Sequence, residues 1–199
     1  MEEGHGERSK PVRDAAFTVW FRLLGILPLA FFLAQAVHYW RRGQLGHMLW
    51  MCNIGNLVMA IGLFLGQAML IRVAAMWSIP GVVIWFRYVV MEWGLFGSSF
   101  SAHVGGLIVG LVALRKVRVN RTAWLHCLGW FLILQLVSRF ATSVEMNVNV
   151  SHTVYQGWQQ VFTAYWKFWL VMTLLVAVGF WLLELVLNKL WPTHASVSL

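Results

Sequence analysis

The sequence has few acidic residues, and this scarcity limits the kind of protein that it can encode. Its 199 residues include 7 Asp and Glu against 15 Lys and Arg, and 60% of all residues are hydrophobic. So little polar surface cannot coat a water-soluble globule. The basic residues stand at the ends of apolar segments, which is typical of membrane topology signals rather than of a nucleic-acid-binding face. We therefore expect membrane lipids as partners and no nucleic acid.

Cysteine is also scarce. Cys52 and Cys127 both fall inside apolar segments, so the sequence does not contain the disulfide framework of a small secreted domain. Residues 1–14 carry charges of both signs and lack the short apolar stretch and the small-residue cleavage site of a signal peptide. We therefore expect the first apolar segment to stay in the protein as a membrane helix.

Long apolar runs dominate what the sequence does contain. Mean hydropathy is +0.69, and runs of about 19–25 residues, enough to cross a hydrocarbon core of about 30 Å as helices, recur along the chain. They cover approximately residues 15–39, 47–65, 71–91, 96–114, 122–140 and 163–187. This pattern predicts an all-α polytopic membrane protein: a six-transmembrane-helix bundle over residues 15–190, with tails at 1–14 and 191–199.

Proline and glycine inside these runs predict how the helices pack. Pro28 predicts a kink in the first run. Pro80 and Gly81 lie in the middle of the third run, where freed backbone groups must be satisfied by neighbours or water, so we expect a kink beside a cavity. Gly106 and Gly110 share a helical face and predict the close approach of a partner helix.

The distribution of basic residues predicts the orientation in the membrane. In a six-helix topology, those of the N-terminal tail, those at 115–121 and Lys189 all fall on one side, and fewer fall on the other. By the positive-inside rule, the first side is cytoplasmic. We expect both termini in the cytoplasm, a location in the plasma (inner) membrane, and the polar connection 141–162 on the outer face.

Two reactive side chains lie at a similar depth in this topology. Cys52 lies about five residues into the second run and His103 about seven into the fourth, and both runs start at the outer face, so both residues are about 8–10 Å deep. A thiol and an imidazole at one level can act as a nucleophile and a general base. Alternatively, Cys52 is a small buried hydrophobic residue and His103 bonds a neighbouring carbonyl.

Polar residues near this pair are candidates for binding a substrate: Asn53, Asn56, Ser99, Asn147, Asn149 and His152. Asn56 shares a helical face with Cys52, and Ser99 shares one with His103. The other candidates adjoin Cys52 or lie in the 141–162 connection, which closes over the same side. The Asn amides could donate hydrogen bonds to a developing oxyanion.

Two other kinds of site match the sequence less well. Residues 102–110 resemble the His-bearing last helix of rhomboid proteases, but no other helix supplies a Gly-x-Ser-Gly nucleophile motif. A haem between His103 and either His38 or His47 needs two facing imidazoles at one depth. That alternative stays open, although no helix carries a paired-His motif. We expect no metal and no cofactor.

Four stretches carry a resemblance to a known family. They read His-Met-Leu-Trp-Met-Cys-Asn-Ile from residue 47, Trp-Ser-Ile-Pro-Gly from 77, Ser-Phe-Ser-Ala-His from 99 and Asn-Val-Asn-Val from 147. Over about 46–187, the chain resembles the YwaF-type integral membrane proteins, a family distantly similar to a Cys-dependent transmembrane phospholipid acyltransferase. The resemblance implies Cys52 as nucleophile and His103 as base. The chain departs from the family pattern in its loop, which lacks the Asn-Tyr form, and has no obvious carboxylate to orient His103.

These observations give one principal functional hypothesis and two alternatives. We expect a lipid acyltransferase or lipid ester hydrolase that uses the Cys52 and His103 pair near the outer leaflet. The first alternative is a non-enzymatic protein that binds or transports a lipid, a quinone or a small solute in the same pocket. The second is a structural subunit whose partner covers the Trp-rich last helix. The sequence predicts no oligomeric state.

Overall fold

The computed structural model describes residues 18–90 and 97–191, and every regular element in this part of the chain is a helix. Its elements are α1 (Val19–Leu23), α2 (Ile26–Arg41), η1 (Leu45–Leu49), α3 (Met51–Leu65), α4 (Ala68–Tyr88), α5 (Gly97–Phe100), η3 (Ser101–Gly105), α6 (Gly106–Val117), α7 (Ala123–Ala141), η4 (Val148–Val150) and α8 (Tyr165–Leu190). Here η1 and η4 are 3-10 turns and η3 is a π-helical segment. The predicted tail 1–14, most of the tail 191–199, and the junction of the third and fourth runs at 91–96 lie outside the described residues.

Five stretches of helix are long and apolar enough to cross a membrane, which indicates an integral membrane protein: Val19–Arg41, Ala68–Tyr88, Gly97–Val117, Ala123–Ala141 and Tyr165–Leu190. They confirm the predicted all-helical membrane fold for the described residues. The second predicted run forms α3, an apolar helix of 15 residues. Its length of about 22 Å falls short of a hydrocarbon core of about 30 Å. The predicted count of six crossings is therefore matched at five positions.

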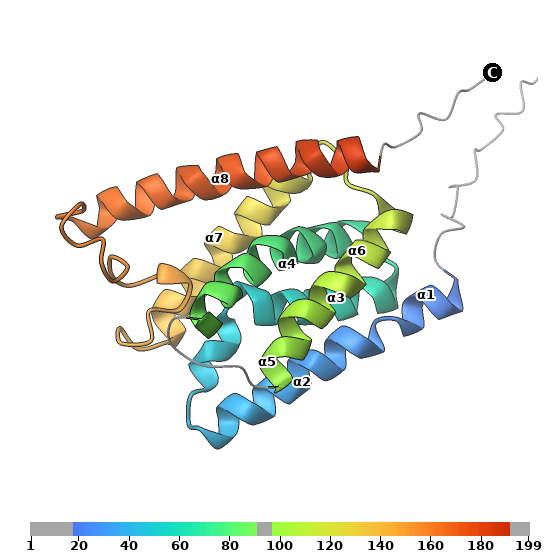
Figure 1. Cartoon of the computed structure of the whole chain (residues 1–199), viewed down its shortest axis with the longest axis horizontal. Helices are drawn as coiled ribbons and strands as arrows, with labels where there is room; N and C mark the ends of the chain where they lie inside the picture. Colours follow the sequence, from blue (N-terminus) through green and yellow to red (C-terminus); the bar gives the residue numbers. More distant parts are fainter. Residues whose placement is uncertain (1–17, 91–96, 192–199) are drawn as a thin grey trace, which may run out of the picture.

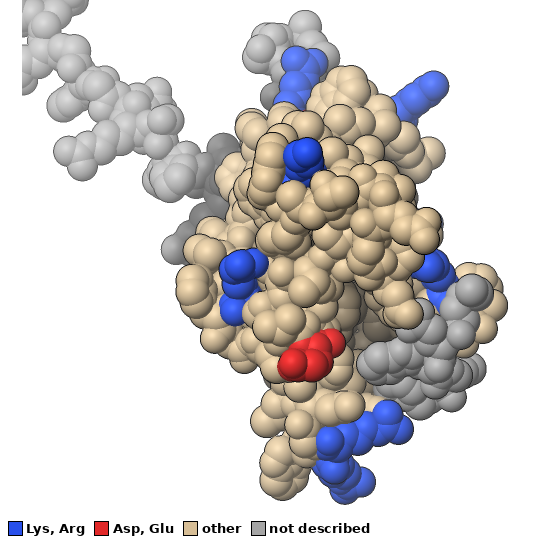
Figure 2. Space-filling view, turned by 90° about the vertical axis from the view of Figure 1, so that its left-hand side faces the viewer, with Lys and Arg blue, Asp and Glu red and all other residues tan. Residues whose placement is uncertain are grey.

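The helices are arranged with α8 along one edge of the bundle, α2 along the opposite edge, and α3 and α4 between them (Figure 1). The start of α1 and the end of α8 lie at the same end of the bundle. The 142–164 connection and the turn between α2 and α3 lie at the opposite end, which we name the loop end. Figure 2 looks onto the loop end, where several Lys and Arg side chains, some of them adjoining at its lower edge, and one acidic patch lie on a mostly uncharged surface.

The first span is interrupted near its beginning. α1 ends at Leu23 and α2 begins at Ile26, with a turn between them. Pro28 lies in the first turn of α2, where its missing N–H is tolerated, and its ring would clash with the carbonyl of Leu24 in a continuous helix. The kink predicted at Pro28 is therefore a break in the helix just before it.

Close packing of α3, α4 and α6 forms the centre of the bundle. A Cβ on Gly106 would lie 2.6 Å from Oδ1 of Asn56 on α3, and one on Gly110 would lie 3.2 Å from Cα of Ala75 on α4. Both distances are tighter than ordinary van der Waals contacts, so glycine lets these helices approach. The close approach predicted at Gly106 and Gly110 is confirmed.

Polar side chains make hydrogen bonds that connect neighbouring helices. Glu184 on α8 is 3% exposed and accepts a hydrogen bond of 3.0 Å from the backbone N–H of Trp124, in the first turn of α7. A carboxylate stabilises this position because helix N-termini carry partial positive charge. Trp77 Nε1 on α4 donates to the carbonyl of Cys127 on α7 at 3.2 Å, and Arg72 donates to the carbonyls that end α6. Cys127 is fully buried and is a packing residue.

The 142–164 connection contains left-handed residues and is held by the end of α7. Asn149 has φ 53° and Val150 has φ 57°, a conformation that costs a β-branched residue about 1–2 kcal/mol. Gln135 Nε2 donates to the carbonyl of Asn149 at 3.1 Å, and Arg139 donates to the carbonyl of Ser151 at 2.7 Å. These bonds hold the connection in its strained path.

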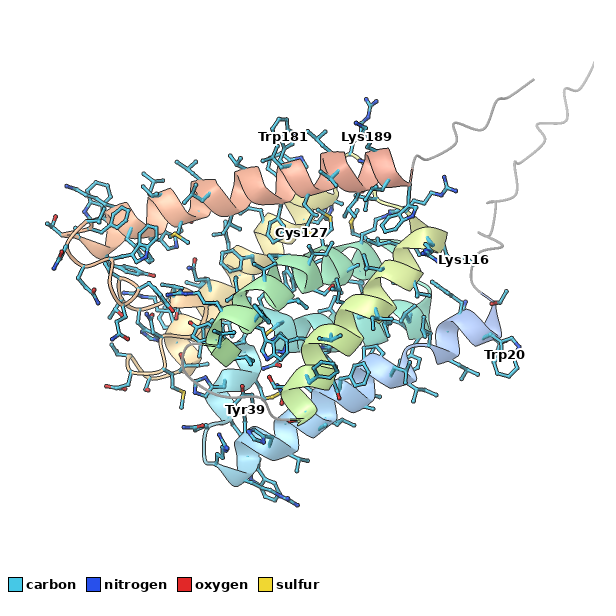
Figure 3. The ribbon with its side chains drawn as sticks, viewed as in Figure 1. Trp20, Tyr39, Lys116, Cys127, Trp181 and Lys189 are labelled. Carbon is cyan, nitrogen blue, oxygen red and sulfur yellow. The ribbon has the colours of Figure 1, made fainter. Side chains whose placement is uncertain are left out.

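Of the spanning helices, α8 has the smallest buried share. Trp181 and Lys189 point away from the bundle, as does Trp20 on α1, whereas Cys127 points inward (Figure 3). A broad apolar outer face suits contact with lipid tails, because a membrane helix need not hide such a face. The bundle therefore uses only one side of α8, and that side forms part of a cavity wall.

Candidate functional site

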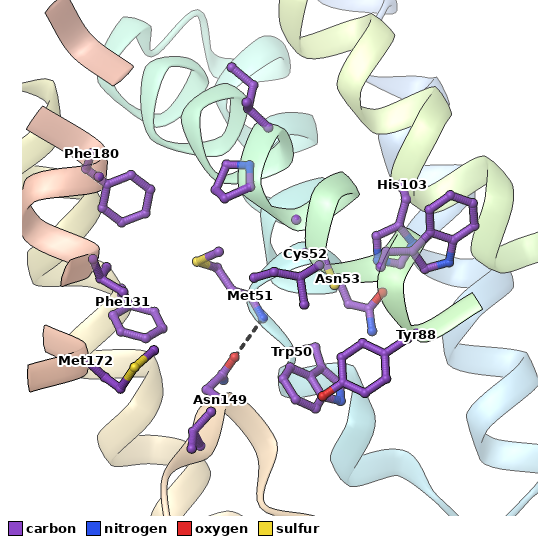
Figure 4. A pocket seen from close by; sticks show the side chains of 18 of the residues that line it. Trp50, Met51, Cys52, Asn53, Tyr88, His103, Phe131, Asn149, Met172 and Phe180 are labelled. Carbon is purple, nitrogen blue, oxygen red and sulfur yellow. Dashed lines mark hydrogen bonds between the residues drawn. The ribbon is translucent and has the colours of Figure 1, made fainter. Parts of the chain in front are cut away.

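A large cavity lies among the helices near the loop end and has a volume of about 560 Å³. Its walls are the start of α3, the second half of α4, the η3 region, Phe131 on α7 and the inner side of α8. Phe131, Met172 and Phe180 lie on one side, and Trp50, Tyr88 and His103 lie on the other (Figure 4). Pro80 and Gly81 both line it, so the cavity predicted beside this pair is confirmed.

Cys52 is the second residue of α3 and lines this cavity. Its position depends on how the helix begins: Met51 N–H has no partner within the helix and donates instead to Asn149 Oδ1 at 3.0 Å. The backbone of α4 lies against the same residue, because a Cβ on Gly81 would be 3.4 Å from the Cβ of Cys52. Cys52 is thus held between a capped helix start and α4.

His103 projects from the π-helical segment η3 and is 8% exposed. Such segments inside α-helices are frequent at functional sites. His103 Nδ1 lies 2.8 Å from the carbonyl oxygen of Ser99, and a carbonyl can only accept, so Nδ1 carries the proton and Nε2 of the neutral ring is an acceptor. The ring stacks on Trp85, with centroids 5.1 Å apart and an angle of 13° between planes. Both contacts fix the orientation of the imidazole.

Cys52 and His103 line the same region of the protein interior. A second cavity of about 10 Å³, roughly the space of one water molecule, adjoins the first, and these two residues are the ones that line both. None of the described residues on either wall is acidic. The group that orients His103 Nδ1 is the carbonyl of Ser99.

Asn53 lines the large cavity and is 1% exposed. Its Nδ2 donates to the carbonyl of His47 at 2.9 Å, whereas its Oδ1 is buried and has no hydrogen-bond partner. An unpaired buried acceptor costs about 1–3 kcal/mol. Asn53 thus holds the start of α3 to η1 through its amide nitrogen, and its oxygen is closed off from the cavity.

The other two candidates on the helices support the site. Asn56 lines the small cavity, and its Nδ2 donates to the carbonyls of Cys52 and Ala102, each at 3.0 Å, which joins α3 to η3. Ser99 lines the large cavity, and its Oγ accepts from Trp85 Nε1 at 2.7 Å. Asn56 and Ser99 thus hold the segments that carry Cys52 and His103.

The three candidate residues in the 142–164 connection make hydrogen bonds that hold the loop in its conformation. Asn149 lines the cavity, but its amide already bonds Met51 N–H, the carbonyl of Leu49 at 2.7 Å and Ser138 Oγ at 2.9 Å. Asn147 Oδ1 accepts from the backbone N–H groups of two loop residues, and His152 Nε2 lies 3.2 Å from Thr142 Oγ1. Asn147 and His152 are not among the described residues that line the cavity.

Charged side chains are missing from the described part of the cavity wall. No Lys, Arg, Asp or Glu lines it, and its one histidine is His103. The two facing imidazoles needed for a haem are therefore not assembled by the described lining residues, since His38 and His47 lie elsewhere. Within residues 18–90 and 97–191, no group of three His, Cys, Asp or Glu side chains could hold a metal.

The tryptophans that hold the polar groups in place could not be recognised from the sequence. Trp85 Nε1 holds Ser99, and Trp169 Nε1 donates to Gln135 Oε1 at 2.7 Å. These pairs join different helices, so no local spacing reveals them. The one local signal is the three-residue separation between His47 and Trp50, whose Nε1 donates to His47 Nδ1 at 3.1 Å.

No protein-family model, curated protein or solved structure matches this chain. The function proposed below is therefore supported by the geometry and chemistry of the cavity.

Proposed function

We propose that this protein binds a lipid-like amphiphile in the large cavity. The observation that carries the proposal is a cavity of about 560 Å³ with a largely apolar wall and a polar region formed by Cys52, Asn53, Ser99 and His103. Cavities of about 300–1,000 Å³ with this kind of lining are typical of small-molecule sites. A ligand with an apolar chain and a small polar head matches both parts of the wall.

The side of α8 that faces the cavity offers access from the bilayer. Gly179 lines the cavity and is exposed, and a Cβ built on it would meet no atom within 4 Å. An apolar chain would therefore reach the cavity between α4 and α8 without crossing water. Membrane lipids are the proposed partners, and the proposed function involves no nucleic acid.

Filling this open position tests the proposal. We expect Gly179→Trp to lower the affinity for tritiated mono-oleoylglycerol at least about tenfold, because the indole would occupy the apolar part of the cavity. The assay is saturable binding to the purified full chain in phosphatidylcholine nanodiscs, corrected for empty nanodiscs. Gly129→Trp is the matched control, since Gly129 is also open but does not line the cavity. Equal binding by both variants would contradict the proposal.

Acyl chemistry at Cys52 is a second candidate, favoured by the wall that Cys52 and His103 share. In this scheme, His103 Nε2 takes the proton of the Cys52 thiol, and Sγ attacks the carbonyl carbon of a lipid ester. The bond from that carbon to the alcohol oxygen breaks, and the leaving oxygen takes the proton from His103. The thioester then passes its acyl group to a second alcohol or to water, which regenerates the thiol. The resemblance to YwaF-type proteins supports this candidate. Catalysis by Cys52 and His103 stays a prediction.

A thioester on Cys52 is directly measurable. We expect mass spectrometry of the chain, after incubation with a lipid ester, to find a hydroxylamine-sensitive acyl group on Cys52 that Cys52→Ala abolishes and His103→Phe slows. Cys127→Ala, which changes a buried packing thiol, should leave the acylation intact. A chain that binds lipid but never carries this group would exclude the second candidate and leave the first.

We also propose that η1 and α3 together form a sixth crossing. Five residues of 3-10 helix add about 10 Å to the 22 Å of α3, which reaches about 30 Å. An even number of crossings agrees with the start of α1 and the end of α8 at the same end of the bundle. We place both termini in the cytoplasm and the protein in the plasma membrane, from the positive-inside pattern. Reporter fusions after residue 199 test this orientation.

A further inference from the structure

We infer that the ligand of the large cavity has a single acyl chain, which lies along α8 from Met172 to Leu183 with its tail pointing away from the loop end. This inference rests on the proposed binding function and adds the number of chains and the direction in which the chain runs. It is supported by the pattern of the α8 wall, by the closed end of the cavity and by the cavity volume.

One face of α8 forms the apolar side of the cavity. Its lining positions recur every three or four residues, the spacing of a single helical face, and they are Met172, Leu175, Val176, Gly179, Phe180 and Leu183. At about 1.5 Å per residue, this stripe is about 16 Å long. One leaflet of the hydrocarbon core, half of about 30 Å, has nearly the same thickness. The stripe therefore matches one acyl chain laid parallel to the helix.

The cavity is closed on the side away from the loop end. The lining residues nearest to that side are Ile79 on α4, Phe131 on α7 and Leu183 on α8. Just beyond them, Trp77 Nε1 donates to the carbonyl of Cys127, which joins α4 to α7, and Glu184 accepts from the N–H of Trp124, which joins α8 to α7. Trp77, Cys127 and Glu184 are 1%, 0% and 3% exposed. A chain in the cavity therefore ends at the level of Leu183.

The polar part of the wall sets the direction of the ligand. Cys52 is the second residue of α3, which begins at the loop end, and His103 lines the cavity with it. A lipid with its head beside these residues and its tail along α8 runs in the same direction as a lipid of the leaflet at the loop end. It would enter between α4 and α8 by lateral movement, without turning over.

The volume of the cavity admits one chain. A methylene group takes up about as much space as a molecule of liquid water, about 30 Å³, so an oleoyl chain needs about 540 Å³ and two chains need about twice that. The cavity has about 560 Å³.

The head region offers a second chain no way out through the described wall. Ser99 and His103 are 4% and 8% exposed, so the head is enclosed. The exposed lining positions Leu175 and Gly179 lie along the chain instead. A two-chain lipid would therefore have to place both chains in the space of one.

Two probes with the same glycerol ester head test the number of chains on the unmodified protein. 1-Oleoyl-2-acetylglycerol has one long chain, and dioleoylglycerol has two. Each competes against tritiated mono-oleoylglycerol on the purified full chain in phosphatidylcholine nanodiscs. We expect dioleoylglycerol to bind at least about tenfold more weakly, because overfilling a packed interior is costly.

A bulky residue at the closed end tests where the chain stops. Leu183→Trp should weaken the binding of mono-oleoylglycerol about tenfold and change that of mono-decanoylglycerol less than about twofold, because the shorter chain ends before this level. Leu182→Trp is the matched control: Leu182 is the neighbouring residue, is 48% exposed and is not among the lining residues. It should bind both probes as the wild type does.

Photolabelling of the wild type tests the direction without any substitution. A mono-oleoylglycerol with a diazirine at the chain terminus should attach to Phe180 or Leu183, and one with the diazirine beside the carbonyl should attach to Met51 or Cys52. The reverse order, or attachment of both probes at one level, would overturn the placement of the chain. This labelling decides the placement if Leu183→Trp does not fold.

Failure of this inference is distinguishable from failure of the proposed function. If dioleoylglycerol binds as tightly as 1-oleoyl-2-acetylglycerol, and Gly179→Trp removes both, the lipid site stands and the single chain is wrong. If a folded Leu183→Trp weakens both chain lengths equally or neither, the end point of the chain is wrong. If no probe shows saturable binding that Gly179→Trp removes, the proposed function is wrong and the inference fails with it.

Discussion

Replacing Asn149 by Ala should destabilise the protein more than a typical loop substitution. The Asn149 side chain joins the 142–164 connection to the start of α3 and to α7 through three hydrogen bonds, with Met51 N–H, the carbonyl of Leu49 and Ser138 Oγ. The residue is 4% exposed and has φ 53°. The variant removes the cap of α3 and places Ala in a left-handed conformation.

The expected magnitude follows from these contacts. Three neutral hydrogen bonds at about 1 kcal/mol each give about 3 kcal/mol. The left-handed backbone adds about 1 kcal/mol for Ala, whereas Asn tolerates this region. We expect Asn149→Ala to lower the free energy of unfolding by about 4 kcal/mol. Asn149→Gly removes the same bonds without the backbone cost, so we expect a loss of about 3 kcal/mol.

A buried thiol provides the assay. In a Cys52→Ala background, Cys127 is the one remaining cysteine and is fully buried, so it reacts with a thiol-reactive dye only after the bundle opens. Titration with SDS in mixed micelles gives the free energy of unfolding for each variant. A loss below about 1 kcal/mol for Asn149→Ala would refute the reasoning, because the three bonds would then be replaceable by other contacts. A larger loss for Gly than for Ala would refute the backbone part.

Two further predictions concern the packing of the bundle. Gly106→Ala should lower the free energy of unfolding by about 2 kcal/mol, because the new Cβ would meet Asn56 Oδ1 at 2.6 Å while Nδ2 of that amide makes two hydrogen bonds. Gly129→Ala, with no atom near its Cβ, should be close to neutral in the same SDS titration. Glu184→Leu should cost about 2 kcal/mol by leaving the N–H of Trp124 unpaired, whereas Glu184→Gln keeps an acceptor and should lose less. Equal losses for the two Glu184 variants would mean that the bond to Trp124 contributes little.

The positions of the helices were predictable because the bilayer imposes a strong constraint on a chain. Backbone groups in hydrocarbon must bond within helices, so apolar runs map directly onto helices. The predicted run at 122–140 is α7 at Ala123–Ala141, and the run at 163–187 is α8 at Tyr165–Leu190. The close approach at Gly106 and the cavity beside Pro80 were also predictable, because each depends on a local property of one residue type.

The detailed site could not be predicted from local patterns. The π-helical segment that carries His103 depends on packing against neighbouring helices, and the sequence around it reads as an ordinary helix. Asn149 was expected to bind substrate, whereas its three hydrogen bonds within the protein make it a cap for α3. Glu184 lies near Lys189 late in the last apolar run, a position that predicts a side chain facing the headgroups, but it is 3% exposed and bonds α7. In each case, the deciding partner lies on another segment.

Photocrosslinking in a membrane tests the central claim, a lipid-binding cavity, most directly. A mono-oleoylglycerol analogue with a diazirine on its chain would be irradiated with the full chain in nanodiscs, and the attachment sites mapped by mass spectrometry. The account predicts attachment to cavity residues such as Met172 and Phe180, competed by unlabelled mono-oleoylglycerol and absent in Gly179→Trp. Attachment confined to outward residues such as Trp181, insensitive to both the competitor and that variant, would contradict it.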